Sequence, residues 1–480
     1  MPPPIRSAQR FALPLLAVLL AGLRPLAAQS PSGDPRSSDP TAALLQELIR
    51  ANTSNPPGNE RRVAEVLLPH FRALGIDAKI IPTPDSTKAV FVARLKGDGS
   101  KRPVLIGAHE DVVGVEREKW SVDPFAGVEK DGHIYGRGAV DFKGGMAVFA
   151  RAVLMLAEQK IPLARDVIFL AEADEEGGGG YSTSWLAREH WDEIDAEFAL
   201  NEGGWIMKAP DGHVRYVSVS TADKLSLPLK VTAHGTSTHS SMPRPDNAIF
   251  ALSRAMAKIS EYETPITLTP EQRQFFLTLA KTSKPPMSTY YRDLVGNDPA
   301  KAKAADAVVS KDPLMHSLVR NTIAPTIING GFRMNVIPGS AEATINLRMI
   351  PGSDPAQLIE TLKKVVADTG IQFTLSTATY PRNAPSPTTT DLYRALEKSA
   401  KAVFPGVEVT PYLFQAGTDA GAWRSKGVPV YGIYPYPIDD DELSRMHGND
   451  EKVSIASLKQ GTEMIYKTLV EVAGRKPTSP

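Results

Sequence analysis

A histidine and two aspartates in the stretch 107–145 have the residue types and spacing of a metal site. His109 and Asp111 form the sequence His-Glu-Asp, and Asp141 lies in the segment GRGAVDFKGG. Imidazole nitrogen and carboxylate oxygen suit a catalytic zinc with an open position, whereas closed structural zinc sites favour cysteine, which this chain lacks. A lone His-x-Asp pattern is common by chance, so the position of these residues in the fold must decide.

Short apolar runs indicate which elements position these residues. The run 104–106 predicts a buried strand, and His109 follows just past its end. Two further runs lead to acidic residues in the same way: 167–170 precedes Glu175 and Glu176, and 198–200 precedes Glu202. Because ligands of open α/β sheets bind beyond the carboxyl ends of the strands, we expect these side chains to meet at one edge of a sheet.

A fourth apolar run, 428–434, precedes a loop that leads to His447, and Asp141 is expected to stand at the start of a helix. Two histidines and three carboxylates are too many ligands for one tetrahedral ion. They are enough for two ions, about 3.5–4 Å apart, that share one bridging carboxylate. The residues therefore predict a dinuclear metal site.

These motifs resemble those of metallopeptidase family twenty, the two-zinc enzymes of the aminoacylase, carboxypeptidase S, glutamate carboxypeptidase and succinyl-diaminopimelate desuccinylase type. The resemblance extends over nearly the whole of the expected mature chain, with the motifs in the family's order. The motifs that carry it are GAHEDVV, Trp120, the DPF at 123–125, DGHIYGRGAVDFKGG, ADEEGGGG, NEGG and MHGNDE.

The resemblance implies two Zn²⁺ ions per chain, with Co²⁺ or Mn²⁺ as substitutes, and a role for each ligand. The implied ligands are the bridging Asp141, then His109 and Glu202 at one ion, and Glu176 and His447 at the other. The resemblance also implies a cis peptide bond between Asp141 and Phe142.

Two acids near these ligands are expected to act without binding metal. Glu175 is the expected general base, because a carboxylate beside a metal-bound water can accept its proton and pass it to the departing amine. Asp111 is expected to accept the other ring N–H of His109 through its carboxylate, which would fix the tautomer and the orientation of the ring.

The pattern changes between residues 211 and 377. Apolar residues alternate with other residues over 225–233 and 341–349, which predicts strands with one wet face. The segments 247–259 and 354–366 read as helices, the second capped by Asp354. These elements predict an α+β domain inserted into a larger α/β domain, which has a mixed, mainly parallel sheet with helices on both faces. The partly helical segment 264–320 has no assigned function.

The resemblance implies that the inserted domain is a lid that also forms a homodimer. It places His239 where a lid histidine, often from the partner subunit, stabilises the oxyanion. Asn335 and Arg348 fall where the family holds its substrate, and Arg348 could pair with a substrate carboxylate. Gly417 and Thr418 are expected to line the substrate site, although Ala416 and the sequence after Asp419 depart from the family's pattern.

The N-terminus has the parts of an export signal. Arg6 and Arg10 precede the apolar run 11–23 and small residues that end at Ala28. We expect cleavage after Ala28 and an exported protein, periplasmic or secreted, without stable membrane insertion; an uncleaved anchor is the alternative. The expected ranges are 1–28 for the signal peptide, 29–40 for a disordered leader, 41–210 and 378–474 for the catalytic domain, and 211–377 for the lid.

The composition fits a hydrolase with a small substrate. Basic and acidic residues both number 54, and no basic stripe suggests nucleic-acid binding. The sequence therefore predicts a zinc hydrolase, a metallopeptidase or metal-dependent amidohydrolase, that cleaves an amide bond in small peptides or N-acyl amino acids. A metabolite N-deacylase or desuccinylase is the near alternative. A binding module without activity on the same fold is the distant alternative, and loss of ligands would mark it.

Overall fold

The protein is described by a computed structural model over residues 36–178, 180–376 and 384–475. The expected signal peptide, 1–28, and most of the expected leader lie outside these residues. In the described part of the chain, no helix is both long and apolar enough to cross a membrane.

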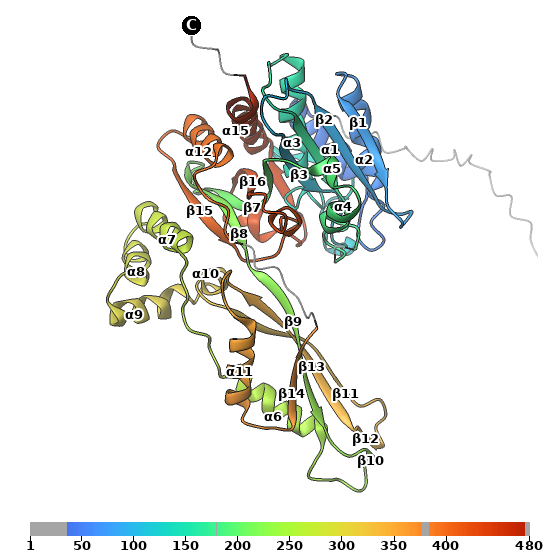
Figure 1. Cartoon of the computed structure of the whole chain (residues 1–480), viewed down its shortest axis with the longest axis vertical. Coiled ribbons are helices and arrows are strands. Elements are labelled where there is room, and N and C mark those ends of the chain that lie inside the picture. The colour runs from blue at the N-terminus through green and yellow to red at the C-terminus, as the bar shows by residue number, and fades with distance from the viewer. Residues whose placement is uncertain (1–35, 179, 377–383, 476–480) are drawn as a thin grey trace, which may run out of the picture. The chain divides into compact units, whose positions relative to one another are not determined.

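A mixed sheet of eight strands forms the centre of the larger domain (Figure 1). Its order is β1 (Asp77–Pro82), β2 (Ala89–Leu95), β6 (Val167–Glu172), β3 (Val104–His109), β7 (Phe198–Lys208), β16 (Val430–Ile438), β8 (Val214–Asp223) and β15 (Glu408–Phe414). The four middle strands from β6 to β16 are parallel, and so are β8 and β15. β1 pairs with β2 and β2 pairs with β6 in antiparallel orientation, and β16 pairs with β8 in the same way. The predicted mainly parallel sheet is confirmed.

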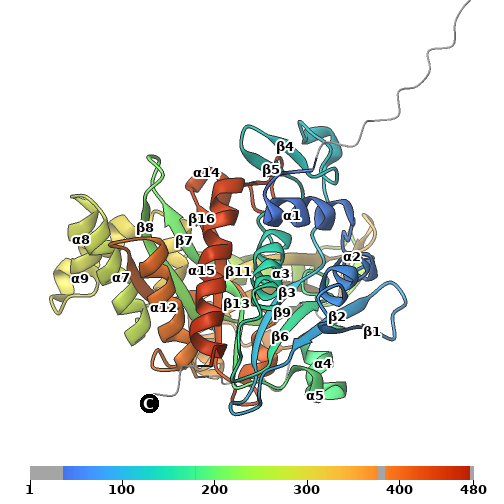
Figure 2. The same ribbon diagram turned by 90° about the horizontal axis from the view of Figure 1, so that it is seen from above.

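Helices cover both faces of this sheet, because alternate strand residues point to opposite sides and both sides are apolar. Ile106 of β3 joins one buried cluster and its neighbour Leu105 joins the other. The first cluster contains α1 (Pro40–Arg50), α2 (Arg61–Arg72), α3 (Lys143–Glu158), α12 (Asp391–Val403) and α15 (Ile455–Ala473). The second contains α4 (Thr183–Glu189), α5 (Trp191–Ile194) and α13 (Gly421–Arg424). Figure 2 shows α15, α3, α1 and α2 apart from α4 and α5.

A second sheet has the strand order β11 (Thr322–Gly330), β13 (Ser340–Met349), β9 (Leu225–His234) and β14 (Ile371–Leu375), all antiparallel. α6 (Ala248–Ser260) and α11 (Pro355–Val366) pack on its apolar face. Asn247 and Asp354 cap these helices with their side chains. The predicted inserted α+β unit is therefore present. A short ribbon of β10 (Thr238–His239) and β12 (Val336–Ile337) extends it.

The boundary expected at residue 211 is wrong. β8 pairs with β15, β16 and β7 in the larger sheet, and the second sheet begins only at Leu225. The segment 264–320 also belongs to the larger domain. It forms α7 (Pro270–Thr282), α8 (Met287–Leu294), α9 (Pro299–Val309) and α10 (Pro313–Leu318). Phe275 of α7 packs edge-on against Tyr216 of β8 and Tyr412 of β15.

A small three-stranded sheet lies beside the larger one, in the order β17 (Lys452–Ser454), β5 (His133–Tyr135) and β4 (Val128–Lys130). It joins the segment before Asp141 to the segment after His447. A single turn of 3-10 helix, η1 (Arg117–Lys119), and α14 (Asp440–Ser444) complete the described elements. The small sheet therefore brings two loops together that are far apart in the sequence.

Candidate metal centre

Asp141 lies at the centre of a group of histidines and acids. Its side chain is buried, and the peptide bond from Asp141 to Phe142 is cis, as the resemblance implied. The two carboxylate oxygens face different histidines: Oδ1 is 3.2 Å from His109 Nε2, and Oδ2 is 3.1 Å from His447 Nε2. One carboxylate can therefore contribute to two metal positions.

Each histidine also faces a second carboxylate. His109 Nε2 lies 3.5 Å from Glu202 Oε2, and His447 Nε2 lies 2.9 Å from Glu176 Oε1. The structure thus brings together all five candidate ligands in two sets, with Asp141 common to both. The ligand atoms of His109, Asp141 and Glu176 lie within 4.8 Å of one another.

The elements deliver these side chains as expected in most cases. His109 is the last residue of β3, and Glu176 follows β6. Glu202 differs, because it lies inside β7 and not at its end. Gly203 has φ 152°, and the pairing of β7 with β16 shifts register opposite these residues, so the strand continues past the site in a bent form. His447 follows α14 in a left-handed conformation, φ 58°.

Glu451 ties the Asp141 loop to the His447 loop. Its fully buried carboxylate accepts hydrogen bonds from three backbone N–H groups, those of Gly138, Val140 and Asp141. It also pairs with Arg137 at 2.5 Å, and Arg137 Nη2 donates to the His447 carbonyl at 3.2 Å. Reasoning from sequence missed Glu451, although it lies in the MHGNDE motif.

The charge of the site fits bound cations. Four acidic side chains converge here, those of Asp141, Glu175, Glu176 and Glu202. Within the described residues none of them forms an ion pair with a lysine or arginine. Burial raises the pKa of Glu202 to about 7, and burial followed by the charge of Glu202 raises the pKa of Glu175 well above its ordinary value. Two divalent ions would offset this concentration of negative charge with ligands of the right chemistry.

The carboxylate of Asp111 has different hydrogen-bond partners from the one expected. The nearest acceptor to His109 Nδ1 is the backbone carbonyl of Asp111, at 2.9 Å, whereas the carboxylate Oδ1 is 3.6 Å away. The carboxylate instead accepts the backbone N–H groups of Glu175 at 3.2 Å and Glu176 at 3.0 Å. It points this way because two N–H donors converge at that turn. Asp111 thus orients both the histidine and the acidic pair, through different atoms.

A model of peptidase family M20/M25/M40 matches residues 105–471. The chain belongs to this family. Human N-fatty-acyl-amino acid synthase/hydrolase PM20D1 is 30% identical over 379 residues, which are 78% of this chain and 74% of that protein. Probable carboxypeptidase S-like 2 of Dictyostelium discoideum is 30% identical over 376 residues, 77% of this chain and 71% of that one.

The same family appears among solved structures. The M20 family metallo-carboxypeptidase Sso-CP2 from Sulfolobus solfataricus has a TM-score of 0.68 at 20% identity, over 90% of this chain and 99% of that chain. The resemblance stated from the motifs is confirmed. The chain is an enzyme of the peptidase or amidohydrolase type, from a metal-dependent family.

Two expected residues of this M20 enzyme lie apart from the metal centre within the chain. His239 is exposed on β10, and its Nδ1 lies 2.8 Å from the Ser241 hydroxyl. Asn335 is exposed before β12, where its carbonyl accepts the backbone N–H of Ser240. Within the described part of the chain, neither His239 nor Asn335 contacts any of the five candidate ligands.

Arg348 of β13 lies nearer to the centre. Burial lowers its pKa, and the charge of nearby Glu175 opposes this. A Cβ on Gly417 would lie 3.6 Å from Arg348 Nη1, so the guanidinium contacts the 415–421 loop. Among the described residues Arg348 has no carboxylate partner, which leaves its planar donor face available to a ligand.

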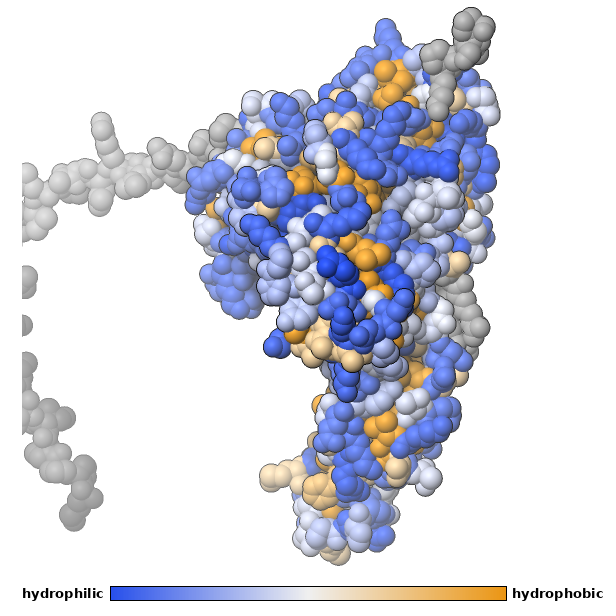
Figure 3. Space-filling model, turned by 90° about the vertical axis from the view of Figure 1, so that its left-hand side faces the viewer, coloured by the Kyte–Doolittle hydropathy of each residue, from blue (hydrophilic) through white to orange (hydrophobic). Residues whose placement is uncertain are grey.

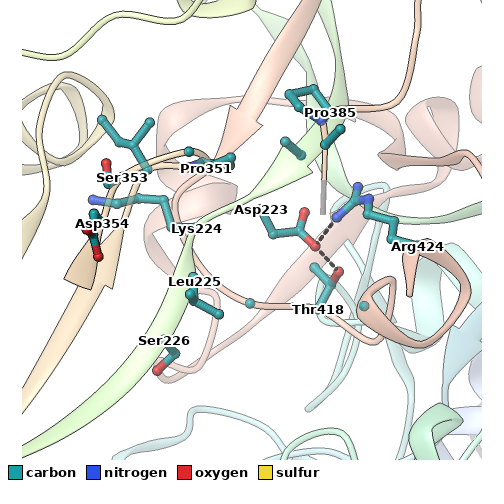
Figure 4. A pocket seen from close by; sticks show the side chains of 16 residues that line it. Asp223, Lys224, Leu225, Ser226, Pro351, Ser353, Asp354, Pro385, Thr418 and Arg424 are labelled. Atoms are coloured by element: carbon teal, nitrogen blue, oxygen red, sulfur yellow. Dashed lines mark hydrogen bonds and ion pairs between the residues drawn. The ribbon is translucent and has the colours of Figure 1, made fainter. Parts of the chain in front are cut away.

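A cavity of about 630 Å³ opens beside this loop (Figure 4). Its lining includes apolar side chains such as Leu225, Ile350 and Pro385. Thr418 also lines it and donates to Asp223 Oδ2 at 2.7 Å, and Arg424 pairs with the same oxygen at 2.5 Å. Figure 4 shows Asp223, Thr418 and Arg424 directed toward one another. This internal pairing offsets the charge of Asp223, and the rest of the lining combines apolar and hydroxyl side chains with the charged Lys224 and Asp354.

Proposed function

We propose that this M20 enzyme is a dinuclear zinc hydrolase that cleaves the amide bond of N-acyl amino acids, with small peptides as the second substrate class. The observation that carries the proposal is the division of Asp141 between two histidine and acid pairs, with the partly buried Glu175 beside them. A relative described as an N-fatty-acyl-amino acid synthase/hydrolase supports the choice of substrate.

The chain's own groups would carry out the proton transfers. Bound to the five candidate ligands, two Zn²⁺ ions would polarise the amide carbonyl and acidify an attacking water. Glu175 accepts the proton of that water and delivers it to the departing amine nitrogen. Its raised pKa suits this exchange, because a carboxylate with a higher pKa accepts a proton more readily.

Arg348 would bind the free carboxylate of the amino-acid half of the substrate. A guanidinium that has no carboxylate partner among the described residues, close to Glu175 and to Gly417, is suited to hold such a group near the reacting bond. The cavity lined by Leu225, Ile350 and Thr418 would receive the half of the substrate that extends away from this carboxylate.

We also propose a homodimer through the second sheet. β11 is an edge strand of that sheet, with its backbone exposed along most of its length. Large apolar side chains are exposed on and around it: Phe250 63%, Ile327 54%, Ile328 66%, Phe332 79% and Met334 99%. Exposed His239 would then act at the metal centre of the partner subunit.

Export remains a prediction from residues 1–28, and N-terminal sequencing of protein recovered outside the cytoplasm tests it. A start at residue 29 supports cleavage, whereas a start at Met1 contradicts it.

A substrate panel tests the proposed activity. Purified protein loaded with zinc is incubated with N-acyl amino acids of increasing acyl length, with dipeptides and with N-succinyl amino acids, and the released amine is measured. We expect turnover of N-acyl amino acids that is lost after chelation and restored by zinc. Turnover of N-succinyl amino acids alone would favour the desuccinylase alternative. Absence of turnover for the whole panel in metal-loaded protein would contradict the proposal.

A further inference from the structure

A buried lysine lies behind the acidic pair of the metal centre. Lys88 stands just before β2, and its side chain is 7% exposed. Its Nζ lies 2.8 Å from Asp174 Oδ1, 3.4 Å from Glu60 Oε1 and 3.4 Å from Asn55 Oδ1. Asp174 directly precedes Glu175 in the sequence, so Lys88 holds the residue from which the acidic pair extends.

The partly buried side-chain amide of Asn55 completes this contact. Asn55 Nδ2 donates to Asp111 Oδ2 at 2.7 Å and to Asp174 Oδ1 at 3.1 Å. One side-chain amide thus bridges the two carboxylates that hold the turn. Asp111 accepts the backbone N–H groups of Glu175 and Glu176, as described above, and Asp174 Oδ2 accepts the backbone N–H of Tyr181 at 3.1 Å.

The turn depends on these contacts for its shape. Asp174 has φ 65°, a left-handed conformation that is uncommon for a non-glycine residue, although aspartate adopts it more readily than most, and the contacts of its side chain hold it there. Gly177 is packed tightly against the same groups: a Cβ there would lie 2.3 Å from Asn55 Nδ2 and 2.4 Å from Asp174 Oδ1. The turn 174–177 therefore has little freedom while the Asn55 and Lys88 contacts persist.

Among the residues that hold the 174–177 turn, Lys88 matters most because of its charge. Asp111, Asp174 and buried Glu60 crowd the same volume, and Lys88 is the cation that pairs with two of them. Burial alone would lower the pKa of Lys88, but the bond with Asp174 and the charge of Glu60 raise it, so the ammonium stays charged. Without this cation, mutual repulsion of the carboxylates would push the turn outward.

We propose that Lys88 and Asn55 are positioning residues that fix the 174–177 turn and so aim Glu175 and Glu176 at the metal centre. Both residues lie before residue 105, outside the part of the chain that the family model matches. The inference rests on the proposed function for the roles of Glu175 and Glu176, but the positions of the contacts do not depend on it.

The test replaces Lys88 and compares metal binding with turnover. In Lys88→Met the stem of the side chain remains and the ammonium is lost. We expect the second equivalent of Zn²⁺ to bind roughly 10- to 100-fold more weakly, the range typical when a group that orients a metal ligand is removed, while the first equivalent is unaffected. The binding is measured by calorimetric titration of metal-free protein. With saturating metal, kcat should fall by a similar factor while KM changes little.

Matched variants separate positioning from a general loss of structure. Lys96→Met removes an exposed lysine from its ion pair with Asp166, on the segment that follows β2, and should leave both metal affinities and kcat unchanged. Lys88→Arg keeps a cation and should recover part of the second affinity. Asn55→Asp sets a third carboxylate against Asp111 and Asp174 and should weaken the same metal position.

The outcomes distinguish this inference from the proposed function. If Lys88→Met or Asn55→Asp binds two metals as the unaltered protein does, the positioning role is wrong. If Lys88→Met does not fold, the Asn55→Asp and Lys88→Arg titrations decide in the same way. If the unaltered protein binds two metals but hydrolyses no substrate of the panel, the proposed function fails, while the titrations still test the positioning.

Discussion

At the residue scale, the two adjacent glutamates of the metal centre have different surroundings. Glu176 Oε1 lies 2.9 Å from His447 Nε2. Glu175 has no ion-pair partner among the described residues, and burial with the charge of Glu202 raises its pKa. A ligand needs a stable contact with its metal, whereas a base needs a carboxylate free to gain and lose a proton. Under the proposed function, one backbone turn therefore presents two identical side chains for two tasks.

Replacing Glu175 with glutamine should separate these tasks. Glu175→Gln keeps the size of the side chain and removes its basicity. We expect kcat to fall by about 10²- to 10⁴-fold, the usual contribution of a general acid–base group, with metal content near that of the unaltered protein. Steady-state kinetics and metal analysis of the same preparation check this. The companion Glu176→Gln should instead lower the metal content, and unchanged turnover in Glu175→Gln would remove Glu175 from the role of base.

The expected bond from the Asp111 carboxylate to His109 shows what sequence reasoning could not reach. Residue type and spacing predicted that Asp111 would lie close to His109, and it does. The direction of its carboxylate depends on Asn55 and on the 174–176 turn, which are distant in the sequence. Lys88 was missed for the same reason, because only the packing of three separate segments makes that lysine buried.

At the scale of elements, the ion pair of Arg137 and Glu451 holds the small sheet and two loops in one arrangement. Both side chains are almost completely buried, at 2% and 0% exposure. Glu451→Gln would leave the Arg137 charge buried without its partner. We expect the free energy of unfolding to fall by about 3–5 kcal/mol. Urea unfolding of metal-free protein measures this.

An exposed ion pair provides the control for this measurement. Arg151 and Glu158 pair at 2.6 Å within α3, with Glu158 38% exposed. Glu158→Gln should change the free energy of unfolding by less than about 1 kcal/mol, as for most surface pairs. Equal effects of Glu451→Gln and Glu158→Gln would contradict the structural role of Glu451.

Lys224 links two further elements and should make their connection sensitive to pH. It lies between β8 and β9, and its Nζ donates to the carbonyls of Ser317 in α10 and Arg320. Burial lowers its pKa to about 7, with the charge of Arg348 as a second cause. An unfolded chain keeps this lysine protonated up to its ordinary pKa. The lysine therefore opposes folding below pH 7, and this effect is relieved as the pH rises from about 7 toward 10.5.

The comparison of Lys224→Met with the unaltered protein isolates this effect. Both proteins share all other titrating groups, so the difference in their free energies of unfolding reports Lys224. We expect Lys224→Met to become progressively less stable relative to the unaltered protein as the pH is raised from 7 to 10. A difference that is constant over this range, measured by denaturant unfolding, would show that the lysine keeps an ordinary pKa.

Local sequence patterns predicted which segments form strands and helices better than they predicted which sheet each strand joins. Alternation of apolar residues predicted β9 and β13, the segment 247–259 was read as the helix α6, and Asp354 with helically spaced apolar residues predicted α11. The boundary at 211 failed because β8 resembles an ordinary strand and its assignment depends on pairing with β15, far along the chain. Glu202 was expected at a strand end because the apolar run 198–200 stops just before it, whereas β7 continues to Lys208.

At the scale of the whole molecule, the proposed dimer gives a test of His239 that needs no structure of the complex. Glu175→Gln and His239→Ala homodimers should each be nearly inactive. When equal amounts of the two variants are mixed and reassembled, half of the dimers contain one metal centre with both Glu175 and His239 intact. Activity should therefore recover to about one quarter of that of the unaltered enzyme. No recovery in verified mixed dimers would mean that His239 does not act across the subunits.

The residues of the candidate metal centre are far apart in the sequence, and this separation has a consequence for the synthesis of the protein. Glu176 and His447 are separated by 271 residues, and Arg137 and Glu451 by 314. A ribosome would have to extend the chain past His447 and Glu451 before the second candidate metal position could close, because domains acquire their long-range contacts only when both partners have emerged. Under the proposed function, an intermediate paused before His447 would hold four of the five candidate ligands and would remain inert until the segment around His447 has emerged.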